Sequence, residues 1–160
     1  VRLHYRSPPR CAGGHVGVVG THLAALAFAV AVTGGDVLEL GAGLWSTPML
    51  RAACGALGQR LVTVETDAET ARRYPGVVLV PSWAEADLSG RWSVALIDCS
   101  PRSARPSLCA HLAHSCELVV VHDMDDGARI GAAVAGMFRS RRDFRDQRPW
   151  TAVLSNLRPV

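Results

Sequence analysis

Five short apolar runs, separated mostly by helix-like segments, constrain the fold of this chain more than any other feature. The runs cover residues 36–40, 61–64, 77–80, 93–97 and 118–121. Each is nearly continuous in apolar residues, which is typical of strands that are buried on both faces of a sheet. The segments predicted as helices are 22–32, 47–56, 68–74, 104–114 and 127–140. This alternation predicts an α/β fold with a mostly parallel sheet and helices on both faces.

Polar side chains stand where these runs end. They are Glu39, Glu65, Asp98, His122 and Asp123. Right-handed crossovers between parallel strands bring all C-terminal strand ends to one edge of the sheet, and ligands of such sheets bind at that edge. We therefore expect these side chains to lie around one site.

The length and composition predict one domain. With 160 residues, of which 49% are hydrophobic and 19% charged, the chain can bury a single hydrophobic core. Residues 1–20 are rich in Gly and Pro and are expected to form an irregular lead-in to a domain over 21–160. Two weaker strand candidates, near 143–147 and 151–155, flank Pro149 in the tail.

The basic residues and cysteines do not indicate a nucleic-acid-binding or zinc-binding protein. The net charge is only +3, and the arginine cluster over 139–148 is interleaved with Asp143 and Asp146, which is typical of a solvated surface. The five cysteines form no CxxC pair. We expect reduced thiols in a cytoplasmic protein that does not bind nucleic acid.

The apolar run Leu23–Val32 superficially resembles a secretory signal, because Arg2, Arg6 and Arg10 precede it. The run is shorter than the roughly 20 apolar residues that cross a membrane. A predicted strand also follows it at once. We therefore expect a helix that covers the core, with Thr21 as its N-cap, and no association with a membrane.

The segment Val37-Leu-Glu-Leu-Gly-Ala-Gly43 carries the strongest functional signal. A strand that runs into Gly-x-Gly predicts a tight turn whose bare backbone lets a ligand approach closely, beside the free N–H groups of a helix start. Dinucleotide-binding folds have a third glycine three residues later, where this chain has Ser46. An NAD(P)-binding oxidoreductase is therefore the second hypothesis rather than the first.

Together with its flanks, this segment resembles a known family. Glu39-Leu-Gly-Ala-Gly-Leu-Trp-Ser-Thr47 is similar to the first motif of class I S-adenosylmethionine-dependent methyltransferases, in which an acidic residue precedes the glycines. The similarity continues in order through Val62–Glu65, Ser82-Trp83, Val94–Asp98 and Val119–Asp123, and covers about residues 21–156. It implies a three-layer Rossmann-like domain with a twisted sheet of about seven strands, the last of them antiparallel.

The resemblance implies that the cofactor is S-adenosylmethionine. Gly41 and Gly43 would pass beneath its methionine part, and Glu39 would order the loop and the cofactor's amino group. Glu65 would accept hydrogen bonds from the two ribose hydroxyls, which suits a carboxylate. The implied cofactor-binding residues are Glu39, Gly41, Ala42, Gly43, Glu65, Thr66, Ser82, Trp83 and Asp98.

The resemblance also implies roles on the adenine and substrate sides. Ser82 and Trp83 would flank the adenine, with Trp83 as an apolar wall, although core packing explains a tryptophan equally well. Asp98 would face the methionine end of the cofactor and the substrate cleft.

A methyltransferase needs a catalytic base only where its acceptor arrives protonated. His122 is the first candidate, because imidazole titrates near neutral pH and this residue stands at a strand end. Asp123 and Asp98 are the alternatives, and His15 in the lead-in and His22 just after it rank below them.

The same strand ends raise the question of a divalent metal. Asp98, His122, Asp123, Asp125 and Asp126 could converge as an oxygen-rich ligand set with one imidazole. Some small-molecule O-methyltransferases hold magnesium and a diol substrate with acidic residues after the fourth and fifth strands. They typically have Asp followed by Asn where this chain has His122-Asp123, so we assign no metal ligands. Helix capping by Asp123 or Asp126 is the alternative.

We expect an enzyme that transfers a methyl group from S-adenosylmethionine to a small molecule or a peptide side chain. Arg102 or Arg105 is a hypothetical clamp for an acidic substrate. A third hypothesis is a non-catalytic cofactor-binding or scaffold protein with the same fold. The apolar helices over 22–32 and 127–138 leave a homodimer open.

Overall fold

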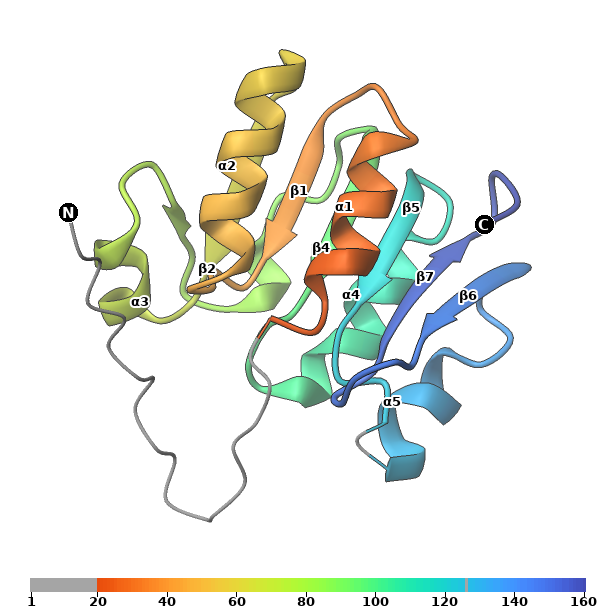
Figure 1. Cartoon of the computed structure of the whole chain (residues 1–160). Helices are drawn as coiled ribbons and strands as arrows, with labels where there is room; N and C mark the ends of the chain where they lie inside the picture. The colour runs from red at the N-terminus through yellow and green to blue at the C-terminus, as the bar shows by residue number, and fades with distance from the viewer. Residues whose placement is uncertain (1–19, 126) are drawn as a thin grey trace, which may run out of the picture.

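The computed structural model describes residues 20–125 and 127–160, and contains a seven-stranded sheet in the order β3-β2-β1-β4-β5-β7-β6 (Figure 1). The strands are β1 (Val37–Leu40), β2 (Leu61–Glu65), β3 (Val78–Leu79), β4 (Trp92–Ile97), β5 (Cys116–Val121), β6 (Ser140–Phe144) and β7 (Thr151–Ser155). The five predicted runs are confirmed as strands β1 to β5, and the second candidate in the tail is confirmed as β7. The prediction that every run is buried on both faces is wrong for β3, which is a two-residue strand at the sheet edge with both residues exposed. The first candidate corresponds to β6, which begins earlier than predicted.

The sheet is parallel except at one edge. β1 pairs in parallel with β2 and with β4, and β4 pairs in parallel with β5. β7 lies between β5 and β6 and is antiparallel to both. The predicted mostly parallel sheet with an antiparallel last strand is therefore confirmed. Its order departs from the 3-2-1-4-5-6 order of dinucleotide-binding folds, because β7 is inserted next to β5.

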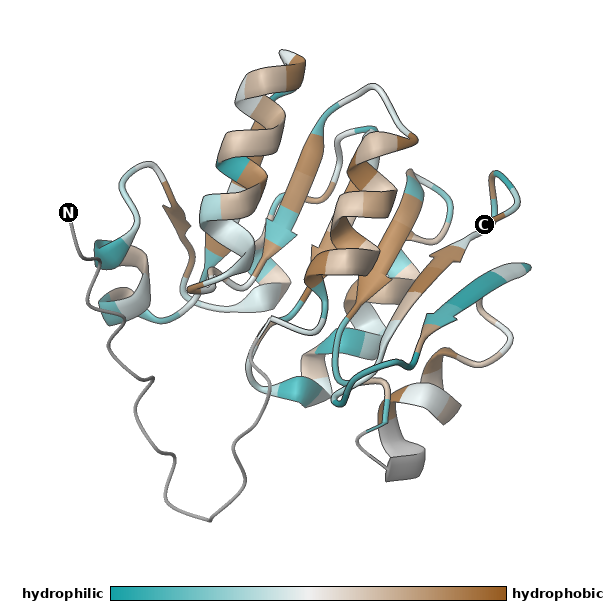
Figure 2. Ribbon diagram, in the orientation of Figure 1, coloured by the Kyte–Doolittle hydropathy of each residue, from teal (hydrophilic) through white to brown (hydrophobic). Residues whose placement is uncertain are grey.

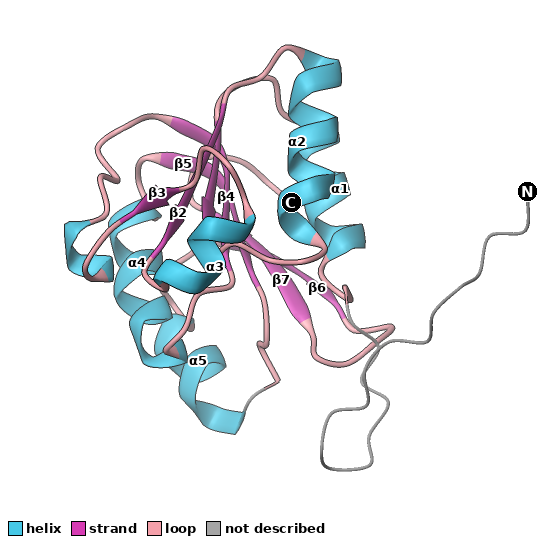
Figure 3. Ribbon diagram, turned by 90° about the vertical axis from the view of Figure 1, so that its left-hand side faces the viewer, coloured by secondary structure: helices cyan, strands magenta, loops and turns pink. Residues whose placement is uncertain are grey.

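Helices cover both faces of the sheet, as predicted. They are α1 (Leu23–Ala31), α2 (Ser46–Leu57), α3 (Ala68–Arg73), α4 (Arg105–Leu112) and α5 (Gly127–Val134), with short 3-10 helices η1 (Trp83–Glu85) and η2 (Arg102–Ala104). α1 and α2 lie on one face, and α4 and α5 lie on the other (Figure 3). The result is a three-layer α/β domain.

Neighbouring residues of the central strands face opposite cores, which explains their nearly continuous apolar sequence. In β4, Val94 and Leu96 belong to the core that includes α1 and α2, whereas Ala95 and Ile97 belong to the core that includes Leu108 of α4. Because both faces exclude water, these strands have no place for alternating polar residues. Figure 2 shows the apolar central strands and the more hydrophilic β6 at the sheet edge.

Two local predictions are wrong. The helix predicted over 127–140 ends at Val134, because Gly136 adopts a left-handed conformation (φ +82°) and the chain turns into β6. Thr21 does not cap α1, whose N-cap residue is His22. The Thr21 hydroxyl instead contacts His122 and the carbonyl of Pro149, both far away in the sequence.

Three further expectations from the sequence concern a membrane-spanning helix, the state of the cysteines and the conformation of the lead-in. Among residues 20–125 and 127–160, no helix combines the length and the apolar character that crossing a membrane requires. The four cysteines in this part of the chain are buried free thiols. The lead-in before Gly20, with Cys11 and His15, lies outside the described residues, as does Asp126.

Candidate functional site

The strand order reverses next to β1, and this reversal marks the candidate site. β2 and β3 extend the sheet on one side of β1, whereas β4 and β5 extend it on the other (Figure 1). In open α/β sheets, ligands bind outside the C-terminal strand ends at such a switch point. The segments that meet there are the glycine turn after β1 and the residues after β4.

Gly41 brings these two segments together. Its φ of +101° lies in the region that favours glycine, and a Cβ at this position would lie 2.7 Å from the backbone oxygen of Asp98. The N–H of Gly41 donates to the carbonyl of Val64 in β2 at 3.0 Å, and the N–H of Gly43 donates to the Thr47 hydroxyl at 2.9 Å. The turn therefore packs closely against both neighbouring strands.

Glu65, at the end of β2, contacts the glycine turn directly. Its Oε2 accepts a hydrogen bond from the N–H of Ala42 at 3.0 Å. Its Oε1 accepts from the N–H of Thr66 at 2.7 Å and from that of Asp67 at 3.0 Å. A carboxylate oxygen has two lone pairs, so Oε2 can accept one further hydrogen bond. The turn and the carboxylate that the resemblance placed around one cofactor are thus in contact.

Glu39 lies inside the protein beneath this turn. It is fully buried, and its carboxylate accepts hydrogen bonds from the hydroxyls of Thr47 in α2 at 3.0 Å and Thr63 in β2 at 2.8 Å. Burial raises the pKa of Glu39, although hydrogen bonds oppose the shift. Glu39 therefore ties the turn to its neighbours from within and has no exposed surface with which to contact a cofactor.

The raised pKa of Glu39 predicts a pH-dependent stability. Because the folded-state pKa exceeds that of an unfolded glutamate, the contribution is fully present below about pH 4.3 and is lost as the pH rises through the folded-state pKa. As the pH rises from about 4.3 through the folded-state pKa, we expect the free energy of unfolding of the wild type to fall relative to that of Glu39→Gln, and then to level off. Urea titrations at several pH values measure it, with Glu69→Gln on the surface of α3 as the matched control. A relative gain of stability with rising pH would contradict the burial argument.

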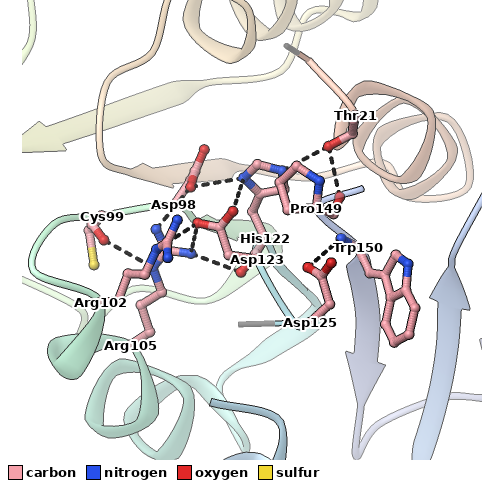
Figure 4. Close-up of polar contacts among 10 residues, drawn as sticks. All are labelled: Thr21, Asp98, Cys99, Arg102, Arg105, His122, Asp123, Asp125, Pro149 and Trp150. Atoms are coloured by element: carbon pink, nitrogen blue, oxygen red, sulfur yellow. Dashed lines mark hydrogen bonds and ion pairs between the residues drawn. The ribbon is translucent and has the colours of Figure 1, made fainter. Parts of the chain in front are cut away.

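A buried arginine connects the ends of β4 and β5 (Figure 4). Arg105 is 2% exposed. Its Nη2 lies 3.1 Å from Asp98 Oδ1, and its Nη1 lies 2.9 Å from Asp123 Oδ2. Its remaining contacts are hydrogen bonds to the carbonyls of Cys99 at 2.9 Å and His122 at 2.8 Å. The guanidinium is thus used within the protein, so Arg105 acts as a structural cation rather than as a substrate clamp.

His122 lies between Asp98 and Thr21 (Figure 4). Its Nδ1 is 3.1 Å from Asp98 Oδ1, and its Nε2 is 2.9 Å from the Thr21 hydroxyl. Thr21 donates its one hydroxyl proton to the carbonyl of Pro149 at 2.8 Å, so it accepts a proton from Nε2. An ionised Asp98 only accepts hydrogen bonds, so Nδ1 faces it with a second proton or with a bound cation. A base role for His122 therefore requires the Thr21 contact to open.

The side chains of Asp98 and Asp123 differ in their ion pairs and in their exposure to solvent. Burial acts to raise the pKa of Asp98, but the hydrogen bond and charge of His122 and the charge of Arg105 outweigh it and hold the pKa below the usual range. Asp123 adopts a φ of 57° and pairs with both Arg105 and Arg102, the latter at 3.1 Å. The side chain of Asp98 is 22% exposed, against 8% for Asp123. Of the two carboxylates, Asp98 is therefore better placed to meet a ligand.

The oxygen-rich metal set considered from the sequence does not assemble among the described residues. Asp125 turns toward β7, where its Oδ1 accepts from the N–H of Trp150 at 2.8 Å. Asp123 is neutralised by two arginines. Neither carboxylate is thus available as a free ligand beside His122.

Trp83 is a core residue in this structure. It is 8% exposed, and its Nε1 donates to the carbonyl of Ser100 at 2.7 Å, whereas Ser82 is exposed. A cavity of about 670 Å³ lies beside Trp83, between η1 and α4, and its lining includes Leu108 and His111 but not the glycine turn. The core-packing interpretation of Trp83 is therefore favoured over an adenine wall.

Two residues at the start of α1 complete the cluster. The sequence suggested Thr21 only as a helix cap, and it placed His22 below the other candidates for a base. Thr21 orients His122 across 101 positions of the chain. The rings of His22 and His122 form a T-shaped pair with centroids 4.6 Å apart. Burial, followed by the charge of His122, lowers the pKa of His22 and favours its neutral form. No local pattern around residues 21 and 22 signals these contacts, because only the folded sheet creates them.

Comparison with known proteins does not assign a family to the chain. No protein-family model matches the sequence, and no curated protein matches it. The functional interpretation therefore depends on the sheet topology and on the contacts at the strand ends.

Proposed function

We propose that this chain transfers a methyl group from S-adenosylmethionine to a small-molecule or peptide side-chain acceptor, as its motifs suggest. The observation that carries the proposal is the 3.0 Å hydrogen bond from the N–H of Ala42 to Glu65 Oε2, which joins the glycine turn to the carboxylate at the end of β2. Both lie at the switch point of the sheet, where α/β folds bind ligands.

The residues at this edge fit the cofactor in two respects. At Gly41 a Cβ would strike the backbone of Asp98, so only a bare backbone leaves the turn this close to the neighbouring strand. Glu65 retains acceptor capacity on Oε2, which suits the ribose hydroxyls. S-adenosylmethionine supplies an electrophilic methyl group when bound, so the task of the chain is mainly to position the two partners.

Asp98 and His122 would act on the acceptor side of the site. Asp98 follows β4, is partly exposed and is held by Arg105 and His122. In this place its carboxylate can accept a hydrogen bond from the acceptor group and orient it. Asp123 supports Arg105 and does not need to touch the substrate.

An NAD(P)-dependent oxidoreductase is less well supported. The antiparallel β7 beside β5 departs from the strand order of dinucleotide-binding folds, and Ser46 replaces their third glycine. A non-catalytic protein with this fold would bind the cofactor but transfer no methyl group to any acceptor in a broad panel.

Calorimetry with S-adenosylhomocysteine tests the proposal. We expect the wild type to bind it and Glu65→Gln to bind it about 10- to 150-fold more weakly, because a hydrogen bond to a charged group contributes roughly 1.5–3 kcal/mol. Glu69→Gln, on the exposed surface of α3, is the matched control and should bind like the wild type. Binding of NAD without binding of S-adenosylhomocysteine, or equal affinities of wild type and E65Q, would reject the proposal.

A further inference from the structure

Three potential metal ligands converge beside the proposed cofactor edge. They come from the N-cap of α1 (His22), the residue after β4 (Asp98) and the residue after β5 (His122). One ligand atom from each side chain lies within 4.8 Å of the others. Because these residues are far apart in the sequence, the fold itself creates the cluster.

His22 is the member that the protein alone leaves unexplained. It is 5% exposed, and neither of its ring nitrogens has a hydrogen-bond partner among the described residues. Native proteins rarely leave buried polar groups without partners, because the hydrogen bonds to water that such groups lose are then not replaced. A ligand that one of these nitrogens binds would account for a buried imidazole at this position.

His122 and Asp98 present the complementary half of the site. The Nε2–H of His122 donates to Thr21, so its Nδ1 faces Asp98 Oδ1 at 3.1 Å. Two ligand atoms about 2.1 Å from one metal ion are about 3.4 Å apart at the tetrahedral angle of zinc sites and about 3.0 Å apart at a right angle, so the observed spacing lies close to that of a ligand pair. A cation between Nδ1 and Oδ1 would take the place of the proton that these two atoms share, while Oδ1 keeps its hydrogen bond from Arg105. The hydrogen bond to Thr21 is then the outer contact that metal-binding histidines typically make.

We propose that His22, Asp98 and His122 bind a divalent transition-metal ion of the zinc type. Two imidazoles and one carboxylate suit zinc, iron, cobalt or nickel, whereas magnesium and calcium prefer ligand sets made of oxygen. This set differs from the oxygen-rich one considered from the sequence, because Asp123 and Asp125 are engaged elsewhere. Three protein ligands leave coordination positions open, as in catalytic rather than structural zinc sites. The site shares Asp98 and His122 with the proposed acceptor side, but metal binding does not require methyl transfer.

Metal titration of the full chain, after removal of any histidine tag, tests the site directly. With Zn²⁺ in calorimetry we expect one ion per chain, and with Co²⁺ an absorption spectrum of nitrogen and oxygen ligation. His22→Ala should weaken binding at least about 100-fold, and Thr21→Val by about 10- to 100-fold as an outer contact. His111→Ala removes an exposed histidine of α4 and should leave binding unchanged.

Stability measurements separate a lost site from a lost fold. Since His22 has no hydrogen-bond partner among the described residues, metal-free His22→Ala should keep the cooperative unfolding of the wild type. Zn²⁺ should raise the Tm of the wild type but not that of the variant. If H22A does not fold, Zn²⁺ affinity and the Tm with and without Zn²⁺ are measured on His22→Gln instead, and these results decide the proposal. The proposal would be overturned if the folded His22 variant bound Zn²⁺ with wild-type affinity, or if H111A lost as much affinity as the His22 variant. It would also be overturned if the wild type bound Mg²⁺ as tightly as Zn²⁺. Calorimetry with S-adenosylhomocysteine in a metal chelator tests the proposed function separately.

Discussion

Arg105→Met is expected to lower the free energy of unfolding by about 3–5 kcal/mol, because it removes the buried cation that Asp98 and Asp123 share and leaves them only His122 and the half-exposed Arg102. Arg105 is 2% exposed and pairs with Asp98 and Asp123 at the ends of β4 and β5. Methionine fills a similar volume but donates no hydrogen bond, so the carbonyls of Cys99 and His122 also lose their partner. Urea denaturation measures the change.

A surface arginine provides the matched control for this substitution. Arg73 pairs with Glu69 on α3, where both side chains are well exposed. Arg73→Met should change the free energy of unfolding by less than about 1 kcal/mol, as surface ion pairs do. A loss at Arg105 no larger than the loss at Arg73 would show that the two aspartates do not need this cation.

Gly41→Ala is expected to destabilise the protein by about 2–5 kcal/mol, from backbone strain together with overpacking. The φ of +101° is unfavourable for alanine, and the added Cβ would lie 2.7 Å from the backbone oxygen of Asp98 and 2.9 Å from Cys99 Cα. These are backbone atoms, so a side-chain rotation cannot relieve the contact. We also expect weaker binding of S-adenosylhomocysteine, because the turn must move.

Gly55→Ala is the control with the opposite expected sign. Gly55 lies within α2, and a Cβ at this position meets nothing within 4 Å. Alanine should therefore stabilise the protein by roughly 0.5–1 kcal/mol, since glycine is the poorer helix former. Stabilisation by alanine at residue 41 as well would refute the close approach of the turn to β4.

The central sheet and the glycine turn could be predicted from the sequence because local chemistry determines them. Nearly continuous apolar runs require burial on both faces, and a strand that ends in Gly-Ala-Gly requires a tight turn. The prediction of a helix over 127–140 was wrong at its C-terminal end. The apolar periodicity continues past Val134, but Gly136 and the pairing of β6 with β7 end the helix there. Tertiary pairing overrides the local pattern there.

The polar cluster could be predicted only in part. Because the C-terminal ends of parallel strands lie at one edge of the sheet, the sequence predicted that Asp98, His122 and Asp123 lie close together. The burial of Arg105 depends on two aspartates that only the folded sheet assembles. The position of His22 depends on how α1 packs against the sheet, and no sequence pattern encodes that contact. Long-range packing therefore supplies the residues that local reasoning missed.

A crystal structure of the chain with S-adenosylhomocysteine would show whether the edge beside β1 binds the cofactor. We expect the ribose hydroxyls within hydrogen-bond distance of Glu65 and the methionine part against the turn of Gly41 and Gly43. A nucleoside bound elsewhere, such as in the cavity between η1 and α4, would contradict the assignment of this sheet edge as the cofactor site.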